Sequence, residues 1–350
     1  MTKSLTGQDF DMKRTMFVTN SLTGGGAERS MNIVVNELSK RGWSVSLVPI
    51  NASEQDLVIP ICEVFPLERN WRGNIVNSLL AFARFVRVVR LWDPEVVVLN
   101  CDLPELFGSL LFGKRQLIVV EHSNLSWSTR HSLGKVIRKI LQLRNTKWVA
   151  VSPHLKIWPT DELAQTVIQN PFLPSTNNIR GTLNPQHILR LISIGRLSIE
   201  KCPHRILEIA AAARISVEII GDGYLRTSLE KFASEIDINV NFRGHVTDPW
   251  SFIKQGDVLI STSRSEGDGL VIIEGLEREI PMILSDISDF RRFGLLEVNY
   301  CGTNDEYVNR IQEYASNRDS LIVSNEIVRS ILSARSLEVI GDAWESLLIR

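Results

Sequence analysis

Cysteine is scarce in this chain of 350 residues, with only Cys62, Cys101, Cys202 and Cys301. They stand far apart, and none forms the Cys-x-x-Cys pair typical of zinc sites and redox centres. This pattern excludes a disulfide scaffold and fits a reducing compartment.

Long apolar runs are missing as well. The stretch from Met1 to Arg14 has no apolar core of the kind that a signal peptide needs. No uninterrupted apolar run approaches the length that spans a membrane. We therefore expect a cytoplasmic protein whose only membrane contact would be peripheral, on the inner face of the membrane.

Metal-ligand clusters and nucleotide-binding P-loops are absent too. Asp9-Phe10-Asp11 imitates a metal-holding pair, but it lies in the polar segment 1–13, which we expect to be disordered. Gly108-x4-Gly113-Lys114 imitates a P-loop, but Arg115 replaces the Ser or Thr, and the segment leads into an expected strand. No group of His, Cys, Asp and Glu has metal-ligand spacing. We predict no catalytic metal, no bound cofactor and no nucleic-acid partner.

The net charge of −1 is unevenly spread. Residues 1–170 carry 20 Lys and Arg against 15 Asp and Glu, whereas residues 171–350 carry 19 against 25. A basic half suggests an anionic partner, such as a membrane surface or a phosphorylated acceptor. A chance imbalance on solvated faces explains the numbers equally well.

Two segments of the basic half carry this charge. The expected helix 75–92 has three arginines at three-residue spacing beside an apolar stripe: Arg84, Arg87 and Arg90 beside Val76, Leu79, Leu80, Ala83 and Val86. Residues 125–160 contain seven basic residues, no acidic one, and Trp127 and Trp148. Such a surface could rest on anionic lipid headgroups. The alternative is a pair of ordinary amphipathic helices whose tryptophans lie in the core.

Apolar, β-branched runs alternate with helical periodicity along the whole chain. In the first half we expect strands at 16–20, 45–50, 96–100, 117–121 and 148–152, with helices at 27–40 and 75–92. After a Pro- and Asn-rich linker at 170–178, strands are expected at 188–194, 217–220, 240–242, 257–261 and 282–285. This alternation predicts an α/β fold of two Rossmann-like, doubly wound parallel-sheet domains facing a cleft. We place the domains at 14–170 and 171–335, with a last helix at 336–350 that returns to the first domain.

The segment 263–275 carries the chemistry of the second domain. It runs from a buried strand through a turn with Gly267 and Gly269 into an apolar helix that begins with Leu270 and Val271. Unpaired N–H groups at a helix start favour a phosphate. The carboxylates of Glu266 and Glu274 accept hydrogen bonds and suit sugar or ribose hydroxyls.

Two further strand ends point to anion binding. Gly24-Gly25-Gly26 precedes a helix and lets the backbone approach a ligand closely. A dinucleotide fingerprint is excluded there, because Arg29 stands where its third glycine belongs. After the first strand of the second domain, Arg196 and Lys201 offer two cations that could stabilise the charge of a leaving diphosphate.

These segments resemble the motifs of one family. Glu266-x7-Glu274 is similar to the Glu-x7-Glu motif of retaining GT-B glycosyltransferases of the family 4, or glycosyl transferases group 1, type. That class includes lipopolysaccharide and capsule transferases. Four further kinds of segment resemble the family in the expected order: the loop 23–29, Glu121-His122, the segment 193–201, and the strand ends 219–223 and 242–246.

The resemblance implies a role for each of these residues. Arg196, Lys201 and the N–H groups of Gly267, Asp268, Gly269, Leu270 and Val271 would hold the diphosphate of a UDP- or GDP-sugar. Glu274 would bind the ribose, Glu266 the sugar hydroxyls, and Gly244, His245 and Val246 would line the nucleobase pocket. Gly25, Gly26 and His122 would orient the sugar, with His122 and Glu266 as catalytic residues.

Three positions depart from the family pattern. Cys202 stands where a glycine is usual, and Glu279 also replaces a glycine, so the helix that starts near Gly269 should end without a glycine cap. Asp268 replaces an aromatic or aliphatic residue. Because a carboxylate beside a diphosphate is repulsive, we expect Asp268 to cap the helix or to face the sugar.

The resulting prediction is a metal-independent retaining hexosyltransferase. It would move a sugar from a nucleotide donor to the hydroxyl of a glycan or lipid-linked acceptor in surface polysaccharide or glycolipid assembly. A sugar-nucleotide epimerase or hydrolase of the same fold, and a non-catalytic binding protein, stay open as alternatives.

Overall fold

The chain is seen in a computed structural model that describes residues 13–349, apart from 24, 54–58, 72–73, 125, 129, 161, 165 and 175–188. The predictions for the segment 1–12, for Gly24 and for residues 175–178 of the linker lie outside the described residues. The chain folds into two compact units. The N-terminal unit comprises Met1–Pro171 and Leu337–Arg350, and the C-terminal unit comprises Phe172–Ser336.

The N-terminal unit is built on a seven-stranded sheet in the order β3-β2-β1-β4-β5-β6-β9. Its neighbouring strands pair in parallel. The strands are β1 (Thr15–Thr19), β2 (Val45–Pro49), β3 (Glu63–Val64), β4 (Val96–Asn100), β5 (Gln116–Glu121), β6 (Lys147–Ala150) and β9 (Thr166–Val167). A small antiparallel pair joins β7 (Lys156–Ile157) to β8 (Glu162–Leu163). The segment 108–114 leads into strand β5, so it has no P-loop geometry.

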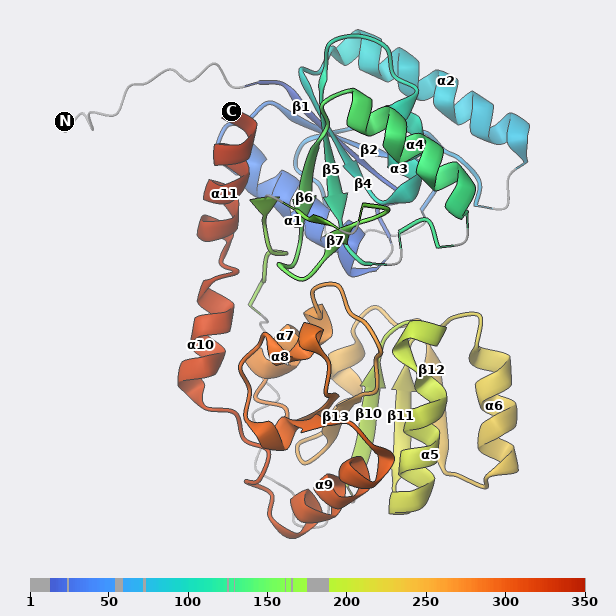
Figure 1. The fold of residues 1–350 in the computed structure, drawn as a ribbon, viewed down its shortest axis with the longest axis vertical. Coiled ribbons are helices and arrows are strands. Elements are labelled where there is room, and N and C mark those ends of the chain that lie inside the picture. The colour runs from blue at the N-terminus through green and yellow to red at the C-terminus, as the bar shows by residue number, and fades with distance from the viewer. Residues whose placement is uncertain are drawn as a thin grey trace, which may run out of the picture. The chain divides into compact units, whose positions relative to one another are not determined.

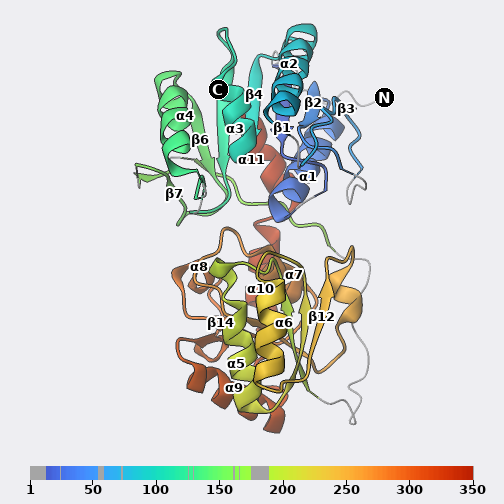
Figure 2. The ribbon, with the colours of Figure 1, turned by 90° about the vertical axis from the view of Figure 1, so that its right-hand side faces the viewer.

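Helices cover both faces of this sheet (Figures 1 and 2). One face packs against α1 (Gly26–Lys40) and α11 (Leu337–Ile349) in one hydrophobic cluster. The other face packs against α2 (Ile75–Trp92), α3 (Asp102–Ser109) and α4 (His131–Leu143) in a second cluster. Figure 2 shows α2, α3 and α4 side by side over their face.

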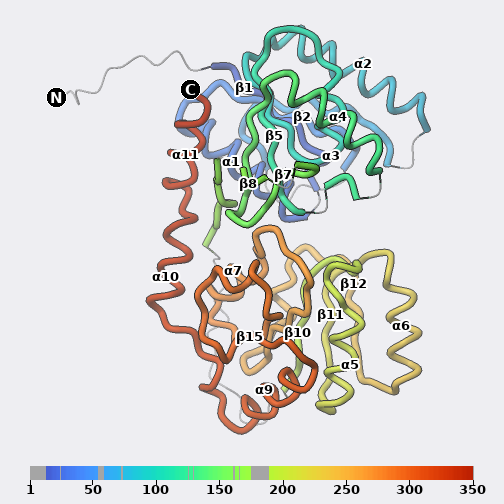
Figure 3. Tube along the Cα trace, in the orientation of Figure 1, coloured from blue at the N-terminus to red at the C-terminus, as the bar shows by residue number. Residues whose placement is uncertain are grey.

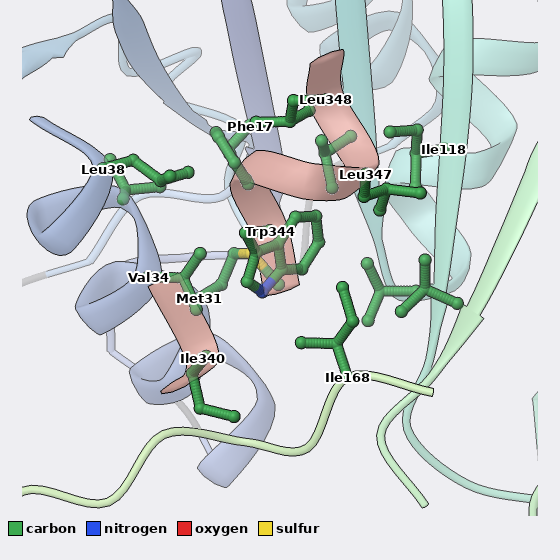
Figure 4. Packing of buried hydrophobic residues seen from close by; sticks show 14 of the residues in the cluster. Phe17, Met31, Val34, Leu38, Ile118, Ile168, Ile340, Trp344, Leu347 and Leu348 are labelled. Carbon is green, nitrogen blue, oxygen red and sulfur yellow. The ribbon is translucent and has the colours of Figure 1, made fainter. Parts of the chain in front are cut away.

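Helix α11 ends the chain and belongs to the N-terminal unit, although α10 (Asn325–Ser333) before it belongs to the other unit. Figure 3 traces this return of the chain. In Figure 4, Ile340, Trp344, Leu347 and Leu348 of α11 lie among side chains of α1, β1 and β5. The guanidinium of Arg41 also binds acidic side chains of α11. Burial of an apolar helix face, rather than helix propensity, therefore holds α11 in place.

The C-terminal unit has a six-stranded parallel sheet in the order β12-β11-β10-β13-β14-β15. The strands are β10 (Arg190–Ile194), β11 (Ser216–Ile220), β12 (Val240–Gly244), β13 (Val258–Ser261), β14 (Met282–Ser285) and β15 (Tyr300–Cys301). The helices are α5 (Pro203–Ala213), α6 (Arg226–Glu235), α7 (Leu270–Glu277), α8 (Ser288–Arg291), α9 (Asn304–Ser316) and α10. Short 3-10 turns lie at Ile199–Lys201, Pro249–Phe252 and Glu297–Asn299. The predicted α/β fold of two parallel-sheet domains is confirmed.

Helix α2 has the predicted bounds and is apolar on two sides. Its core-facing residues are Ala81, Phe85 and Val89 at four-residue spacing. Leu79 and Leu80, from the apolar stripe seen in the sequence, are more than half exposed. That stripe is therefore not the side that packs against the sheet.

The tryptophans of residues 125–160 lie with the core, as the alternative interpretation held. Trp127 is buried in the cluster under α2, α3 and α4, and Trp148 packs against the same cluster. Trp148 also lies 5.2 Å from the guanidinium carbon of Arg138. Trp127 is thus buried, and Trp148 is half-buried against the core.

Candidate active site

The predicted residues of the C-terminal unit gather where the strand order reverses. Strands β10 and β13 are neighbours in the sheet, and the chain runs outward from them in opposite directions. Arg196 and Lys201 follow β10, whereas Glu266 and α7 follow β13. Such a reversal point opens a crevice at the carboxyl ends of the strands, where α/β proteins bind ligands.

Lys201 and Glu266 form an ion pair at this point. Lys201 Nζ lies 2.5 Å from Glu266 Oε2, and Ser263 Oγ donates to Glu266 Oε1 at 2.7 Å. The backbone N–H of Glu266 donates to Asp289 Oδ2 at 2.8 Å. The two paired side chains stay 32% and 11% exposed, so solvent or a ligand can reach them. A cation and a carboxylate are thus presented together at one edge of the sheet.

Helix α7 begins directly after this turn. Gly269 adopts the left-handed conformation, with φ of 60°, which a residue with a side chain rarely takes. Its carbonyl accepts bonds from the N–H groups of Ile272 and Ile273. The N–H groups of Leu270 and Val271 have no hydrogen-bond partner among the described residues. The helix start therefore has two donors, the N–H groups of Leu270 and Val271, and a positive dipole end that could face an anion.

Glu274 lies one turn further along α7, on the same helix as these donors. Its Oε2 accepts a hydrogen bond of 2.7 Å from Trp250 Nε1. The indole of Trp250 is itself buried and stacks 4.6 Å from the guanidinium carbon of Arg278. The Glu274 carboxylate is therefore held in one orientation while its residue stays half-buried.

The remaining predicted residues of this unit occupy neighbouring strand ends. Arg196 is exposed, and no ion pair involves it within the described part of the chain. Gly244, with φ of 71°, accepts a bond from Gly221 N–H at 2.8 Å. His245 is exposed, and Val246 packs partly against a core cluster of this unit. Gly244, His245 and Val246 lie at the end of β12, which is separated from β10 by β11, and within the described residues none of them, nor Arg196, forms a hydrogen bond or ion pair with Lys201 or Glu266.

The prediction for the Asp268 side chain is wrong. The start of α7 has no side-chain cap. The Asp268 carboxylate turns away from the helix start and pairs with Arg292 at 2.8 Å and Arg335 at 2.9 Å. Its side chain is only 1% exposed, so it does not face a ligand there. Two guanidinium groups attract the carboxylate more strongly than a helix N-terminus does.

The predicted residues of the N-terminal unit lie at the corresponding edge of its own sheet. Gly25 and Gly26 follow β1 and are exposed. The N–H of Gly25 donates to Glu28 Oε2 at 3.1 Å, so the buried Glu28 shapes the described part of the glycine loop. His122 follows β5, and its Nε2 lies 2.5 Å from Oδ1 of Asn100, the last residue of β4.

Asn100 connects these groups. Because its Oδ1 can only accept, His122 Nε2 donates to it. Asn100 Nδ2 donates in turn to Thr19 Oγ1 at 3.3 Å and to Ala27 O at 3.4 Å. Desolvation of the ring lowers the pKa of His122 to about 4. The imidazole is therefore neutral at physiological pH, with Nδ1 left as an acceptor.

A buried ion cluster includes Glu121, the residue directly before His122. Arg138 of α4 pairs with Glu105 of α3 and Glu121 of β5, each at 2.7 Å. The indole N–H of Trp127 also donates to Glu105 at 2.8 Å. Burial raises the pKa of Glu105 to about 7 and raises that of Glu121 as well, against the lowering effect of Arg138. This cluster binds residues on both sides of His122: Glu121, directly before it, and Trp127, after it.

Sequence reasoning missed the residues that hold the predicted ones. Ser263, Asp289 and Trp250 bind Glu266 or Glu274, and Asn100 binds His122. Ser263 and Asn100 stand at strand ends, so their position was a usable signal. Trp250 lies in the 3-10 turn Pro249–Phe252 and Asp289 in the short helix α8, both distant in sequence from their partners, and no local pattern marks them. Among the described residues, no three His, Cys, Asp or Glu side chains form a group that could hold a metal ion.

Similarity to known families covers the C-terminal unit. Residues 176–318 match the family model described as "Glycosyl transferases group 1". An uncharacterized glycosyltransferase of Haemophilus influenzae is 24% identical over 361 residues, covering 95% of this chain and 98% of the relative. A Campylobacter jejuni enzyme is also 24% identical, over 78% of this chain and 79% of its own. Its name is GalNAc-alpha-(1->4)-GalNAc-alpha-(1->3)-diNAcBac-PP-undecaprenol alpha-1,4-N-acetyl-D-galactosaminyltransferase.

Solved structures resemble the whole chain. Anabaena HepE in complex with UDP and glucose has a TM-score of 0.76 at 18% identity, covering 96% of this chain and 99% of its own. Sucrose-phosphate synthase from Thermosynechococcus elongatus has the same score and identity, covering 95% and 97%. The lipopolysaccharide outer core galactosyltransferase WaaB has a TM-score of 0.65 at 18% identity, covering 95% and 98%. The fold is that of the GT-B glycosyltransferases, and together with the family match it supports a glycosyltransferase.

Proposed function

We propose that this glycosyltransferase moves a sugar from a UDP- or GDP-sugar to the hydroxyl of a lipid-linked glycan or other glycan acceptor, with retention at the anomeric carbon and without a metal ion. The observation that carries the proposal is the geometry after β10 and β13. There Lys201 pairs with Glu266 directly before a helix start with unpartnered N–H groups. HepE, a neighbour in fold, is seen with UDP and glucose, which supports a donor of this class.

Each group has a task in this reaction. Lys201, Arg196 and the N–H groups of α7 would bind the diphosphate and stabilise its charge as the bond to the sugar breaks. Glu274 would hold the ribose, and Glu266 the sugar hydroxyls. Because these fixed charges are in place before the reaction, they supply what a divalent cation would otherwise supply. EDTA should therefore leave the rate unchanged.

The N-terminal unit would contribute the glycine loop and His122. The neutral imidazole accepts a hydrogen bond at Nδ1, which suits a sugar hydroxyl. In the proposed step, the bond from the anomeric carbon to the diphosphate oxygen breaks. The acceptor oxygen bonds to the same face of that carbon, and its proton passes to the leaving phosphate oxygen. No protein nucleophile is needed.

Two substitutions test the site. We expect Glu274→Ala to abolish thermal stabilisation by the nucleotide, whereas Glu266→Gln should keep nucleotide binding and lower kcat by about 10²–10³-fold. Diphosphate release, with and without a lipid-linked acceptor, is the measurement. Glu313, a partly exposed carboxylate on α9, provides the control substitution Glu313→Gln. Normal transfer by both site variants would refute the assignment.

The same assay separates the alternatives. A sugar-nucleotide epimerase or hydrolase would consume the donor without an acceptor, and a binding protein would bind it without turnover. The ordered pairing of Lys201, Glu266 and Ser263 favours a working site over a degenerate one. Diphosphate release that requires the acceptor is the outcome expected for a transferase.

An anionic membrane is the proposed docking partner of the N-terminal unit. Its α2–α4 surface consists of the exposed side chains of α2, residues 110–112 and α4. Large apolar residues there are exposed, including Leu79 at 63%, Phe112 at 91% and Val136 at 58%. Basic residues lie among them: Arg84, Arg87, Arg90, Lys135 and Lys139. Neither α2 nor α4 contains an acidic residue.

Apolar side chains set among cations match a lipid surface of negative charge. No helix within the described residues is long and apolar enough to cross a bilayer, so contact would be from one side. The Campylobacter relative is named for an undecaprenol-linked substrate, which supports a lipid-linked acceptor.

Vesicle sedimentation tests this contact. We expect binding to phosphatidylglycerol vesicles, at least about tenfold weaker binding to phosphatidylcholine, and a loss of about tenfold for Leu79→Glu/Leu80→Glu. Ile322→Glu, at a similarly exposed residue of the C-terminal unit, is the matched control. Equal binding of both variants would refute the α2–α4 surface as the contact.

A further inference from the structure

Asp268 poses an electrostatic problem in the donor site. It stands in the turn between Glu266 and α7, where a diphosphate is proposed to bind, and a free carboxylate there would repel that ligand. Its side chain is buried, and Oδ1 accepts bonds from Arg292 Nη2 at 2.8 Å and Arg335 Nη2 at 2.9 Å. Two guanidinium groups facing one carboxylate leave this cluster with a net positive charge beneath the turn.

Arg292 fixes the backbone of the turn as well as the carboxylate. Its Nη2 donates to the Asp268 carbonyl at 2.6 Å, and its Nε donates to the Asp289 carbonyl at 2.9 Å. The ring of Phe293 lies 4.7 Å from the Arg292 guanidinium carbon and 5.9 Å from that of Arg335. A Cβ on Gly269 would lie 3.4 Å from the same ring. The conformation of the turn thus depends on the packing of this cluster.

Arg335 connects the turn to the places where the chain passes between the two units. The chain leaves the N-terminal unit at Pro171–Phe172 and returns to it at Ser336–Leu337. The carbonyl of Arg335 accepts a hydrogen bond of 2.9 Å from Phe172 N–H, so the two passages are joined. Phe172 also packs in the cluster that contains Trp250, the residue that donates to Glu274.

We propose that Arg335 is a positioning residue for donor binding: through Asp268 it sets the turn that presents the N–H groups of α7, and it ties that turn to both interunit passages. This inference rests on the proposed function. It explains why an acidic residue is tolerated at position 268. It also gives the passages a role in nucleotide affinity without any contact to the nucleotide.

Binding of UDP and GDP, measured by calorimetry at a temperature where each variant is folded, tests the proposal. We expect Arg335→Met to weaken binding of the nucleotide that the wild type prefers by about tenfold. Arg335→Lys, which keeps the charge, should recover affinity to within about threefold of wild type. The double variant Asp268→Asn/Arg335→Met removes both charges together and should bind weakly as well. If Arg335→Met does not fold, this double variant takes its place in the binding measurement.

The matched control is Arg190→Met. Arg190 pairs with the buried Asp257 at 2.7 Å in the same unit, at the opposite edge of the sheet. Its loss should lower Tm as Arg335→Met does and leave nucleotide affinity unchanged. Hydrogen exchange gives a second readout: in the wild type, the nucleotide should slow exchange at residues 333–340, and Arg335→Met should remove this effect.

Two outcomes distinguish a failure of this inference from a failure of the proposed function. If Arg335→Met is less stable but binds the nucleotide as the wild type does, Arg335 is only structural and the inference fails while the proposed function stands. If the wild type binds neither UDP nor GDP, the proposed function fails, and this inference with it.

Discussion

The two units share one architecture but differ in the exposure of the ion pairs beside their predicted site residues. In the C-terminal unit, the pair of Lys201 and Glu266 follows the carboxyl ends of the strands and stays partly exposed. In the N-terminal unit, the ion cluster that includes Glu121, the residue before His122, is buried: Glu105, Glu121 and Arg138 are at most 1% exposed. The predicted site residues that the N-terminal unit presents are a neutral histidine and glycine backbone.

This difference agrees with the proposed roles of the two units. A diphosphate needs fixed positive charge, which the C-terminal unit would supply under the proposed function. An acceptor hydroxyl needs neutral hydrogen-bonding groups, and a membrane-bound acceptor also needs an apolar contact surface. The exposed apolar residues of α2 and α4 would provide that surface under the same proposal.

The largest expected effect comes from breaking the buried cluster of the N-terminal unit. Arg138→Met leaves Glu105 and Glu121 buried without their cation, so we expect a loss of about 3–5 kcal/mol in the free energy of unfolding. Arg291 of the C-terminal unit also binds two acids, Asp286 and Glu297, but at the surface. Arg291→Ala should cause no measurable loss, because solvent screens exposed pairs.

Urea denaturation of both variants checks this contrast. Adding Glu105→Gln to Arg138→Met should recover part of the loss, since one buried charge is then removed. Equal losses for Arg138→Met and Arg291→Ala would mean that burial does not distinguish the two clusters.

A second prediction concerns acidification. The pKa of His122 falls from 6.5 in the unfolded chain to about 4 in the folded protein. Between these pH values the unfolded chain binds a proton that the folded protein excludes, so this group lowers stability as the pH drops from about 6.5 to 4. Glu105 acts oppositely: its pKa is raised to about 7, so it adds stability as the pH falls from 7 to about 4.5.

Comparison with His122→Gln isolates the histidine. Between pH 7 and 4.5, the variant should gain about 2 kcal/mol in unfolding free energy relative to the wild type. Glu306 of the C-terminal unit is the control, because backbone N–H groups lower the pKa of its carboxyl and its contribution is lost only below pH 4.5. Glu306→Gln should therefore show a flat difference from pH 7 to 5. A flat difference for His122→Gln would contradict the neutral, desolvated imidazole.

The sequence predicted most of the helices and strands that local sequence patterns indicate. The helix 75–92 and the strands 96–100 and 282–285 have the predicted bounds, because β-branched runs and helical periodicity are local signals. The two-residue strands such as β3 and β15 were not predicted, since pairing alone defines them. Residues at the carboxyl ends of β10 and β13 could be placed together because parallel topology fixes where strands end.

What could not be predicted depends on partners far away in the chain. Asp268 turned toward Arg335, 67 residues later, and no local pattern signals that ion pair. The sequence could not show which face of α2 is buried, because both sides are apolar and only packing distinguishes Phe85 from Leu79. The positions that depart from the pattern the sequence resembles were thus visible in the sequence, but the contacts that accommodate them were not.

Glu279, another of these departures, keeps the geometry of a glycine cap without the glycine. It follows α7 in the left-handed conformation with φ of 56°. Its N–H donates to the Leu276 carbonyl, and the N–H of Ile280 donates to the Gly275 carbonyl. These are the two hydrogen bonds of the helix C-cap in which the left-handed residue is usually a glycine. Left-handed backbone costs a residue with a side chain about 1–2 kcal/mol, most of all a β-branched one.

The smallest expected effect follows from this cap. We expect Glu279→Val to be about 1–2 kcal/mol less stable than Glu279→Gly. At Arg329, an exposed residue in the middle of α10, the order should reverse, because glycine inside a helix is less favourable than valine. Thermal denaturation of the four variants measures both differences, and the same order at both positions would mean that Glu279 is not held in the left-handed conformation.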